Sequence, residues 1–307
     1  IKATKSGNVS SFNCEEELIL AEKILEIDPW ASKVKFAKTG GEANTIALRI
    51  ARSHSNKQDV AFCGYHGWHD WYLSANFKNK NNLDRHLLSG LSTTGVHKKL
   101  KNTATPFEYN NFDQLNKIIN HNNNIGIILM EVMRNQKPKN DFLRKVRKLA
   151  NKKNLILIFD ECTSGFRETF GGIYKKFNVI PDIIVYGKAL GNGYPITCVA
   201  GKKEIMNSAE DSFISSTYWS DRVGYAAALE TLSQMNKQKS WKKISKIGKY
   251  IKKKWLYYAK KNKIKIKIQG LDAIPSFYFL NENHEKFVAL ITSEMLKKNI
   301  LASNVIY

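Results

Sequence analysis

The sequence predicts an α/β fold in which helices cover both faces of a mostly parallel β-sheet. Three apolar runs of strand length support this prediction: IGIILMEV (125–132), LILIFDE (155–161) and PDIIVYG (181–187). Strands that are buried on both faces read as unbroken apolar runs rather than as alternating ones. The helical spacing of DFLRKVRKLANKK (141–153) between the first two runs adds the alternation of helix and strand that is typical of such sheets.

The amino-terminal part of the chain predicts two helices and another strand. CEEELILAEKILEI (14–27) has apolar residues at helical spacing and acidic residues in its first turn, and Asp28-Pro29 ends it. EANTIALRIARS (42–53) predicts a second helix, which is entered through a pair of glycines. DVAFCG (59–64) reads as a strand, and the aromatic stretch YHGWHDWY reads as the loop that follows it.

Beyond residue 232 the sequence changes character, and we predict a second domain there. Apolar residues recur every three or four positions, with lysines between them, at Trp241, Ile244, Ile247, Ile251, Trp255 and Tyr258. This spacing predicts an amphipathic helix with a solvated lysine face, although a membrane-surface helix has a similar pattern. The alternating IKIKI (264–268) predicts a strand. We therefore divide the chain into a large domain, residues 1–232, and a partial α+β small domain, residues 233–307.

Length and composition favour a cytoplasmic protein with a sizeable core. The 307 residues are 43% hydrophobic, but no apolar run approaches the ~20 residues that a membrane span needs. No signal peptide precedes the first long helix. The four cysteines lie far apart, at Cys14, Cys63, Cys162 and Cys198, which argues against a disulfide framework or a zinc ribbon. The start at Ile1 and the end within NILASNVIY are typical of a fragment whose amino-terminal segment and small domain are incomplete.

The formal net charge of +22 raises the question of nucleic-acid binding, but the kind of cation argues against it. Arginine is the better partner for phosphates and base edges, yet it supplies only eight of the 49 lysine and arginine residues. Helix-turn-helix, RRM and zinc-finger patterns do not appear. We therefore expect neither a nucleic acid nor a membrane as a partner.

Three polar residues stand at or just beyond the carboxyl ends of the predicted strands: Glu131, Asp160 and Lys188. Ligands of open α/β sheets bind beyond this edge, so we expect two acids and a lysine around one crevice. A phosphate-binding P-loop is excluded for Lys188, because Asp182 and Ala189 stand where that motif needs Gly and Ser or Thr.

A lysine in apolar, glycine-rich surroundings can act as a nucleophile, because desolvation lowers the pKa of its amine. Such a lysine can hold a carbonyl compound as a Schiff base, and pyridoxal 5′-phosphate is the common cofactor of this type. This cofactor needs a carboxylate at its ring nitrogen, backbone amides of a helix start at its phosphate, and an aromatic residue against its ring. Three places in the sequence meet these needs: Asp160, the pair Gly40 and Gly41, and the pair Tyr65 and His66.

Five segments, in order along the chain, resemble the successive signatures of class III aminotransferases. They are FAKTGGEANTIALRIAR, GYHGWHDW, LIFDECTSGFR, YGKALGNGYP and SSTYWSDRVGYAAALETL. The resemblance runs from residue 13 to about residue 305, and it is strongest to the branch that contains glutamate-1-semialdehyde 2,1-aminomutase. It implies a pyridoxal-phosphate-dependent transferase of fold type I that moves an amino group on small-molecule amino and carbonyl substrates.

The resemblance also implies roles for single residues. Lys188 matches the lysine that forms the Schiff base, and Asp160 matches the partner of the pyridine nitrogen. Gly40 and Gly41 match the turn that binds the phosphate, and Tyr65 with His66 matches the loop that stacks on the ring. Thr217 matches a threonine that binds the phosphate of the neighbouring subunit's cofactor, so a homodimer with shared active sites is implied.

The chain departs from the family pattern after Glu131. The pattern E-P-V-x-G-N appears as EVMRN (131–135), which is one residue shorter and has Val132 in place of proline. We expect Glu131 to stay near the cofactor, and Asn135 is the weaker match. Cys162 replaces a valine beneath the ring, which exchanges one small hydrophobic residue for another.

Several interpretations stay open. The reaction is either transamination or the shift of an amino group within one molecule. The alternatives are an aminotransferase for amino sugars or other keto or aldehyde substrates of surface-polysaccharide metabolism, and a catalytically silent homologue with a scaffold role. Arg167 either binds a substrate carboxylate or pairs with Glu131 or another acid.

The remaining polar and aromatic residues suggest no further chemistry. His66, His69 and Asp70 have the spacing of a partial metal site, but no third ligand cluster accompanies them, and we predict no metal. The aromatic residues Trp68, Trp71 and Tyr72 are expected in packing or dimer contacts. Glu42 is expected to cap or stabilise the start of its helix.

Overall fold

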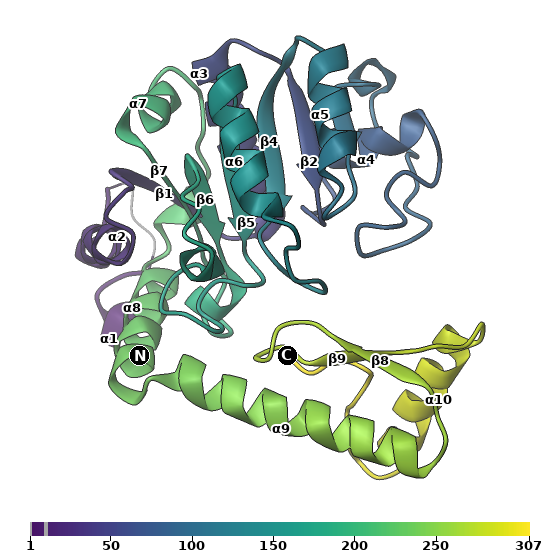
Figure 1. Cartoon of the computed structure of the whole chain (residues 1–307). Coiled ribbons are helices and arrows are strands. Elements are labelled where there is room, and N and C mark those ends of the chain that lie inside the picture. Colours follow the sequence, from purple (N-terminus) through teal and green to yellow (C-terminus); the bar gives the residue numbers. More distant parts are fainter. Residues whose placement is uncertain (1, 9–11) are drawn as a thin grey trace.

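The computed structural model describes residues 2–8 and 12–307. In this part of the chain, seven strands form one sheet in the order β1-β7-β6-β5-β4-β2-β3 (Figure 1). Their bounds are Lys33–Ala37 (β1), Asp59–Cys63 (β2), Ala104–Pro106 (β3), Ile125–Glu131 (β4), Ile156–Glu161 (β5), Ile183–Tyr186 (β6) and Thr197–Gly201 (β7). Neighbouring strands from β3 to β6 are parallel, whereas β7 runs antiparallel to both β6 and β1. The predicted α/β fold with a mostly parallel sheet is confirmed.

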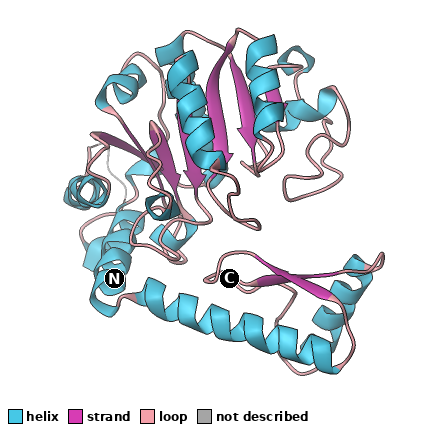
Figure 2. Cartoon of the chain, in the orientation of Figure 1, coloured by secondary structure: helices cyan, strands magenta, loops and turns pink. Residues whose placement is uncertain are grey.

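Helices lie on both faces of this sheet (Figure 2). The longer ones are Glu15–Ile27 (α2), Gly40–Ser55 (α3), Phe112–His121 (α5), Phe142–Lys153 (α6), Arg222–Gln238 (α8), Ser240–Lys261 (α9) and His284–Leu296 (α10). The short ones are Lys2–Lys5 (α1), Asp70–Leu73 (α4) and Lys203–Met206 (α7). Single 3-10 turns are Ser74–Phe77 (η1), Lys98–Leu100 (η2), Ile173–Lys176 (η3), Lys188–Leu190 (η4), Asn207–Ala209 (η5) and Thr217–Ser220 (η6). The helices predicted over 14–27, 42–53 and 141–153 are α2, α3 and α6.

The central strands contribute side chains to two separate hydrophobic cores, one on each face of the sheet. In β4, Ile127 and Leu129 pack with α3, α4 and α7, whereas Ile128 and Met130 pack with α2, α5, α6 and α8. Successive side chains of a strand point to opposite faces, and here both faces are covered by helices. This is why β4 is buried throughout and is apolar up to its last residue, Glu131, as its apolar run predicted.

Beyond α9 the chain forms a small antiparallel pair, Ile266–Gln269 (β8) with Ser276–Phe279 (β9), and then α10 (Figure 1). The predicted helix and strand are therefore present. The predicted apolar face of α9 is wrong at Ile247 and Tyr258, which are 57% and 54% exposed. The buried side of α9 includes Gly248 instead, because the backbone at Asp272 approaches so closely that a Cβ on this glycine would lie 1.6 Å from the Asp272 carbonyl oxygen.

The predicted division at residues 232 and 233 falls inside α8, which continues to Gln238. The chain turns at Lys239, whose backbone is left-handed with φ 51°, and α9 begins at the next residue. The division into two domains stays a prediction. In the described part of the chain, no helix is both long enough and apolar enough to cross a bilayer.

Candidate active site

The predicted crevice residues meet at the carboxyl ends of three adjacent strands. Glu131 ends β4 and is the register partner of Asp160 in β5, and β6 lies next to β5. β6 ends at Tyr186, and a single residue, Gly187, separates it from Lys188. These strand ends point toward the part of the chain that carries α9, β8 and β9 (Figure 1). The prediction that one sheet edge gathers two acids and a lysine is confirmed.

Asp160 is a buried carboxylate held by three donors. Its Oδ2 accepts hydrogen bonds from Asn44 Nδ2 and His66 Nδ1, both at 2.8 Å, and its Oδ1 accepts one from the Cys162 amide at 3.0 Å. Burial alone raises the pKa of Asp160, but the His66, Cys162 and Asn44 hydrogen bonds outweigh it and hold the pKa below its ordinary value. Each carboxylate oxygen can accept two hydrogen bonds, so Oδ1 keeps one acceptor position.

Lys188 lies at the first residue of η4 with a left-handed backbone of φ 43°. Its Nζ donates to Thr163 Oγ1 at 2.8 Å, and its side chain stays exposed at the mouth of the crevice. The protein that surrounds the amine lowers its pKa by desolvation, and the nearby Arg134 guanidinium lowers it further. The prediction of a lysine with a lowered pKa agrees with this geometry, although the amine is less enclosed than its apolar surroundings in the sequence suggested.

Arg134 is a site residue that sequence reasoning missed. Its Nη2 donates to Thr163 Oγ1 at 2.5 Å, and its Nε lies 3.1 Å from Glu131 Oε1. Glu131 is buried, which raises its pKa, while the Arg134 charge acts in the opposite direction. The segment EVMRN has no periodicity that fixes the direction of its side chains, so only the fold brings Arg134 to Lys188.

Gly40 and Gly41 form the start of α3, directly behind a capping box. The Thr39 side chain accepts a hydrogen bond from the Glu42 amide at 3.3 Å, and Glu42 Oε2 accepts one from the Thr39 amide at 2.8 Å. The expected capping role of Glu42 is confirmed. The amides of Gly40 and Gly41 have no acceptor among the described residues, as is usual for the first turn of a helix.

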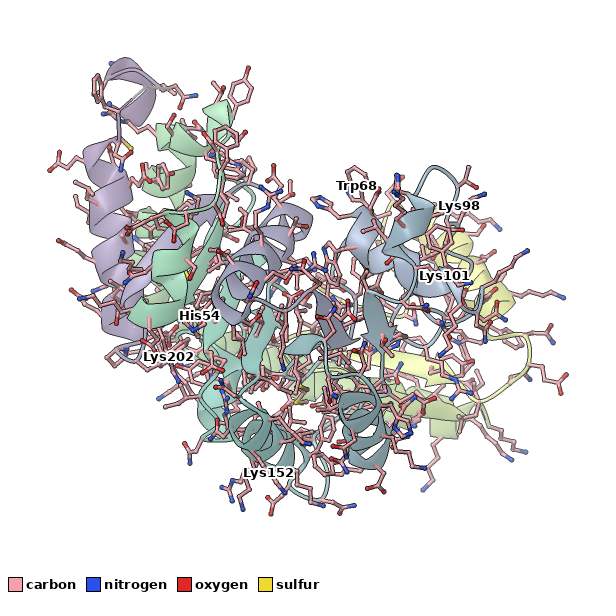
Figure 3. The ribbon with its side chains drawn as sticks, turned by 90° about the horizontal axis from the view of Figure 1, so that it is seen from above. His54, Trp68, Lys98, Lys101, Lys152 and Lys202 are labelled. Carbon is pink, nitrogen blue, oxygen red and sulfur yellow. The ribbon has the colours of Figure 1, made fainter. Side chains whose placement is uncertain are left out.

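The loop after β2 lies against this helix start. His69 Nδ1 is 2.7 Å from Thr45 Oγ1, and a Cβ on Gly41 would lie 3.1 Å from His69 Nε2. The His66 ring is buried and engages Asp160, whereas Tyr65 is half-buried beside it. Among the described residues, no three His, Cys, Asp or Glu side chains are placed to bind a metal ion. Trp71 and Tyr72 are buried in the core, but Trp68 is 71% exposed (Figure 3).

Two cavities adjoin the crevice. One, of about 280 Å³, lies between the large sheet and the β8–β9 pair, and the other, of about 240 Å³, lies over the end of β2. Leu87, Arg134 and Asn135 line both cavities. The first is also lined by Thr163, which accepts the hydrogen bond from Lys188, so it opens next to the lysine.

Of three other predicted residues, Thr217 lies apart from this centre, Arg167 lacks its expected partner, and Cys162 lies next to Asp160. Thr217 is exposed at the start of η6 and lines a separate hollow of about 670 Å³. The expected pairing of Arg167 with Glu131 is wrong, because Glu131 pairs with Arg134, and Arg167 has no acidic partner among the described residues. Cys162 is buried beneath the start of α3, where a Cβ on Gly40 would lie 3.4 Å from its Sγ.

A sequence profile of the family described as aminotransferase class-III matches residues 2–303, almost the whole chain. The chain belongs to the class III aminotransferase family. Solved structures of a FumI protein and of a transaminase share its fold. A FumI protein from Sphingopyxis sp. MTA144 in its PLP internal aldimine form superposes with a TM-score of 0.87 at 20% identity, covering 99% of this chain and 72% of that one. An omega-transaminase from Sphaerobacter thermophilus gives the same TM-score at 19% identity, covering 99% and 75%.

Curated members of the class III family are similar in sequence as well. A 3-aminobutyryl-CoA aminotransferase of Cloacimonas acidaminovorans is 35% identical over 76% of this chain and 54% of its own length. A glutamate-1-semialdehyde 2,1-aminomutase of Nitrosopumilus maritimus is 34% identical over 81% of this chain and 59% of its own length. The chain thus spans little more than half the length of these two relatives.

Proposed function

We propose that this chain binds pyridoxal 5′-phosphate and transfers an amino group, as a class III aminotransferase or 2,1-aminomutase. The observation that carries the proposal is the placement of Asp160 and Lys188 at the ends of adjacent strands. Asp160 keeps a low pKa and a free acceptor position at Oδ1, while Lys188 offers an amine from the neighbouring loop. The intact pair favours catalysis over a silent scaffold role.

The residues around this pair fit the cofactor. A free acceptor on a buried carboxylate suits a protonated ring nitrogen, and two unpartnered amides at the start of α3 suit a phosphate. In our proposal Asp160 binds the ring nitrogen, Gly40 and Gly41 bind the phosphate, and Tyr65 lies against the ring. His66 positions Asp160 through its hydrogen bond, and Glu131 borders the ring side of the crevice.

When bound, pyridoxal 5′-phosphate supplies an aldehyde that takes up amino groups and a ring that accepts electrons. Lys188 is then the general base and acid: its Nζ removes a proton from the substrate carbon and returns it to another atom. The lowered pKa of Lys188 increases the fraction of neutral amine that can accept this proton. Asp160 stays ionised near neutral pH, because its pKa is below the ordinary value. Thr163 holds the Lys188 amine by accepting its hydrogen bond.

The assembly and location belong to the same proposal. We propose a homodimer in which Thr217 of each subunit serves the site of the other, since Thr217 is exposed and lines a hollow apart from Lys188. The four free, buried cysteines favour a reducing cytoplasm. We place the division between the two domains at the turn around Lys239.

Borohydride reduction followed by peptide mass spectrometry tests the proposal. The protein is incubated with pyridoxal 5′-phosphate, its absorption spectrum is recorded, and reduction joins the cofactor permanently to the lysine that holds it. We expect a lysine-dependent absorption band and a modified peptide that contains Lys188. Lys188→Ala should lose both, whereas Lys98→Ala, at an exposed position far along the chain, should keep both. A band that persists in Lys188→Ala, or modification of another lysine, contradicts the proposal.

A further inference from the structure

Arg134 forms part of the wall between the two cavities beside Lys188. The cavity of about 280 Å³ is otherwise lined by uncharged side chains: Leu87, Asn135, Thr163, Gln269, Leu271, Ile274, Ser276, Asn304, Val305 and Tyr307. Arg134 is thus the one charged residue among the described residues that line it. A cavity of this kind, with an apolar floor, a few amides and hydroxyls and a single cation, suits a small molecule that carries one negative charge.

The hydrogen bonds of Arg134 leave part of its guanidinium free. Nη2 donates to Thr163 and Nε faces Glu131, but the buried Nη1 has no partner among the described residues. A guanidinium carries five N–H donors, and an unpaired donor in the interior is costly unless a ligand or water completes it. Arg134 therefore keeps donor capacity that no acceptor among the described residues uses.

Thr163 couples this arginine to the candidate catalytic lysine. Its Oγ1 accepts hydrogen bonds from both Lys188 Nζ and Arg134 Nη2, at 2.8 Å and 2.5 Å. Two cations thus meet at one uncharged hydroxyl. Of the nearby acids among the described residues, Asp160 is already engaged by Asn44 and His66, which leaves Glu131 to balance Arg134. An anion that binds at Arg134 would remove this excess of positive charge next to the lysine.

We propose that Arg134 binds the carboxylate of the substrate and makes this chain selective for amino and oxo acids over uncharged amines. The inference rests on the proposed function, because it names the substrate class of the same site. Arg134 stands in the segment where this chain is one residue shorter than the family pattern E-P-V-x-G-N, so the pattern itself assigns it no role. A guanidinium binds a carboxylate by charge-assisted hydrogen bonds, which are stronger than neutral ones.

Matched substrates separate this role from a merely structural one. The rate of amino-group uptake by the cofactor is measured with 3-aminopropanoate and with its uncharged isostere 3-aminopropanamide. We expect the native protein to have a higher kcat/KM for the acid than for the amide. Arg134→Gln should lower kcat/KM for the acid by roughly tenfold to a hundredfold and should change kcat/KM for the amide much less. Arg134→Lys should recover part of the preference. If the arginine has only a structural role, Arg134→Gln will lower kcat/KM for both substrates by the same factor, and that outcome overturns the proposal.

Two further variants serve as controls in the same assay. Thr163→Val removes the hydroxyl that accepts from both Lys188 and Arg134 but keeps the Arg134 charge, so both substrates should slow while the acid keeps part of its advantage over the amide. Arg144→Gln removes an exposed arginine of α6 and should leave the acid-to-amide ratio unchanged. A ratio that falls equally in Arg144→Gln would show a long-range effect of net charge and would contradict a specific contact at Arg134.

A binding measurement decides the inference independently of catalysis. The protein is labelled at its eight arginines, and their Nε–H resonances are followed during titration with propionate and, separately, with propionamide. We expect one resonance, absent from Arg134→Lys, to shift and saturate with propionate only. If no amine reacts but this shift occurs, the proposed function fails and the arginine site stands. If amines react but no arginine resonance responds to propionate, the arginine site fails and the proposed function stands.

Discussion

His86 shows how a single buried residue affects stability. Its Nδ1 accepts a hydrogen bond from the Gly64 amide at 3.2 Å, and its ring packs 5.7 Å from that of Phe62. Burial and, to a lesser extent, the neighbouring His66 lower the pKa of His86 to about 4, while Glu108 opposes them. The folded protein therefore holds His86 neutral just behind the loop that carries Tyr65 and His66.

We expect His86 to make the protein sensitive to mild acid. Between pH 6.5 and 4 the unfolded chain binds a proton that the folded chain excludes, so stability falls as the pH drops through this range. His86→Asn keeps an acceptor for Gly64 but does not titrate. The free energy of unfolding is measured with urea at about pH 7.5 and about pH 5. From the higher to the lower pH it should fall by about 1 to 2 kcal/mol more in the native protein than in this variant. His97→Asn, at an exposed histidine that likewise accepts from a backbone amide, should behave as the native protein does. Equal losses in all three proteins would contradict the prediction.

The residues of the site differ in how far the sequence could predict them. Asp160 and Lys188 end unbroken apolar runs, and that local pattern places them at one sheet edge. Thr163 and Arg134 carry no such pattern, and they meet only because β4 and β5 are neighbours in the sheet. The contact between His66 and Asp160 joins positions 94 residues apart, which no local spacing can predict.

At the scale of single elements, the start of α3 carries both stability and the candidate phosphate site. The capping box of Thr39 and Glu42 provides acceptors for the amides of these two residues, whereas the amides of Gly40 and Gly41 have no acceptor in the described part of the chain. Thr39 also lies next to β7, because its carbonyl accepts a hydrogen bond from Thr197 Oγ1 at 3.4 Å. The cap therefore sets the direction in which the glycine amides point.

We expect Thr39→Ala to lower the free energy of unfolding by about 1 kcal/mol and also to weaken pyridoxal 5′-phosphate binding. Thr39→Ser should retain both properties, since serine caps equally well. The matched control is Asn111→Ala, which removes the cap of α5, where the Asn111 side chain accepts from the Gln114 amide at 3.0 Å. Urea unfolding and cofactor titration measure the two effects. Weakened cofactor binding in Asn111→Ala would show that lost stability alone explains the result.

Elements with a strong period were predictable, and those set by tertiary contacts were not. The apolar runs of β4, β5 and β6 and the spacing of α2, α3 and α6 predicted these elements to within a few residues. β1 was missed because its sequence KVKFA is half polar and it exists by pairing with the antiparallel β7. The exposed side of α9 was misjudged because periodicity shows that a helix is amphipathic but not which turn packs against it.

At the scale of the whole molecule, mixed subunits test the proposed sharing of sites. Lys188→Ala and Thr217→Ala proteins should each be weakly active alone. If Thr217 serves the partner's site, a dimer of one Lys188→Ala and one Thr217→Ala subunit has one site with both residues native. Refolding an equal mixture should then recover about a quarter of native activity, because about half of the dimers are mixed and each has one complete site.

The same experiment has a clear contrary outcome. If Thr217 acts within its own subunit, no mixed dimer contains a complete site, and the mixture should be no more active than the average of its parts. A protein that sediments as a monomer would contradict the dimer itself. As a control, Arg85→Ala, at an exposed residue paired with Glu108, replaces Thr217→Ala in the mixture, which should then keep about half of native activity under either arrangement.

The reversed direction of β7 has a consequence for the way the lysine is held. After a parallel strand the chain usually departs into a crossover helix and is anchored to the sheet edge on one side only. Here the loop from Gly187 to Ile196 returns at once into β7, whose Cys198 pairs with Tyr186 in β6. The lysine therefore lies in a short loop whose two ends are fixed by adjacent strands of the same sheet. Opening this loop, for instance by circular permutation between Asn192 and Gly193, would leave the lysine attached to the sheet through β6 alone.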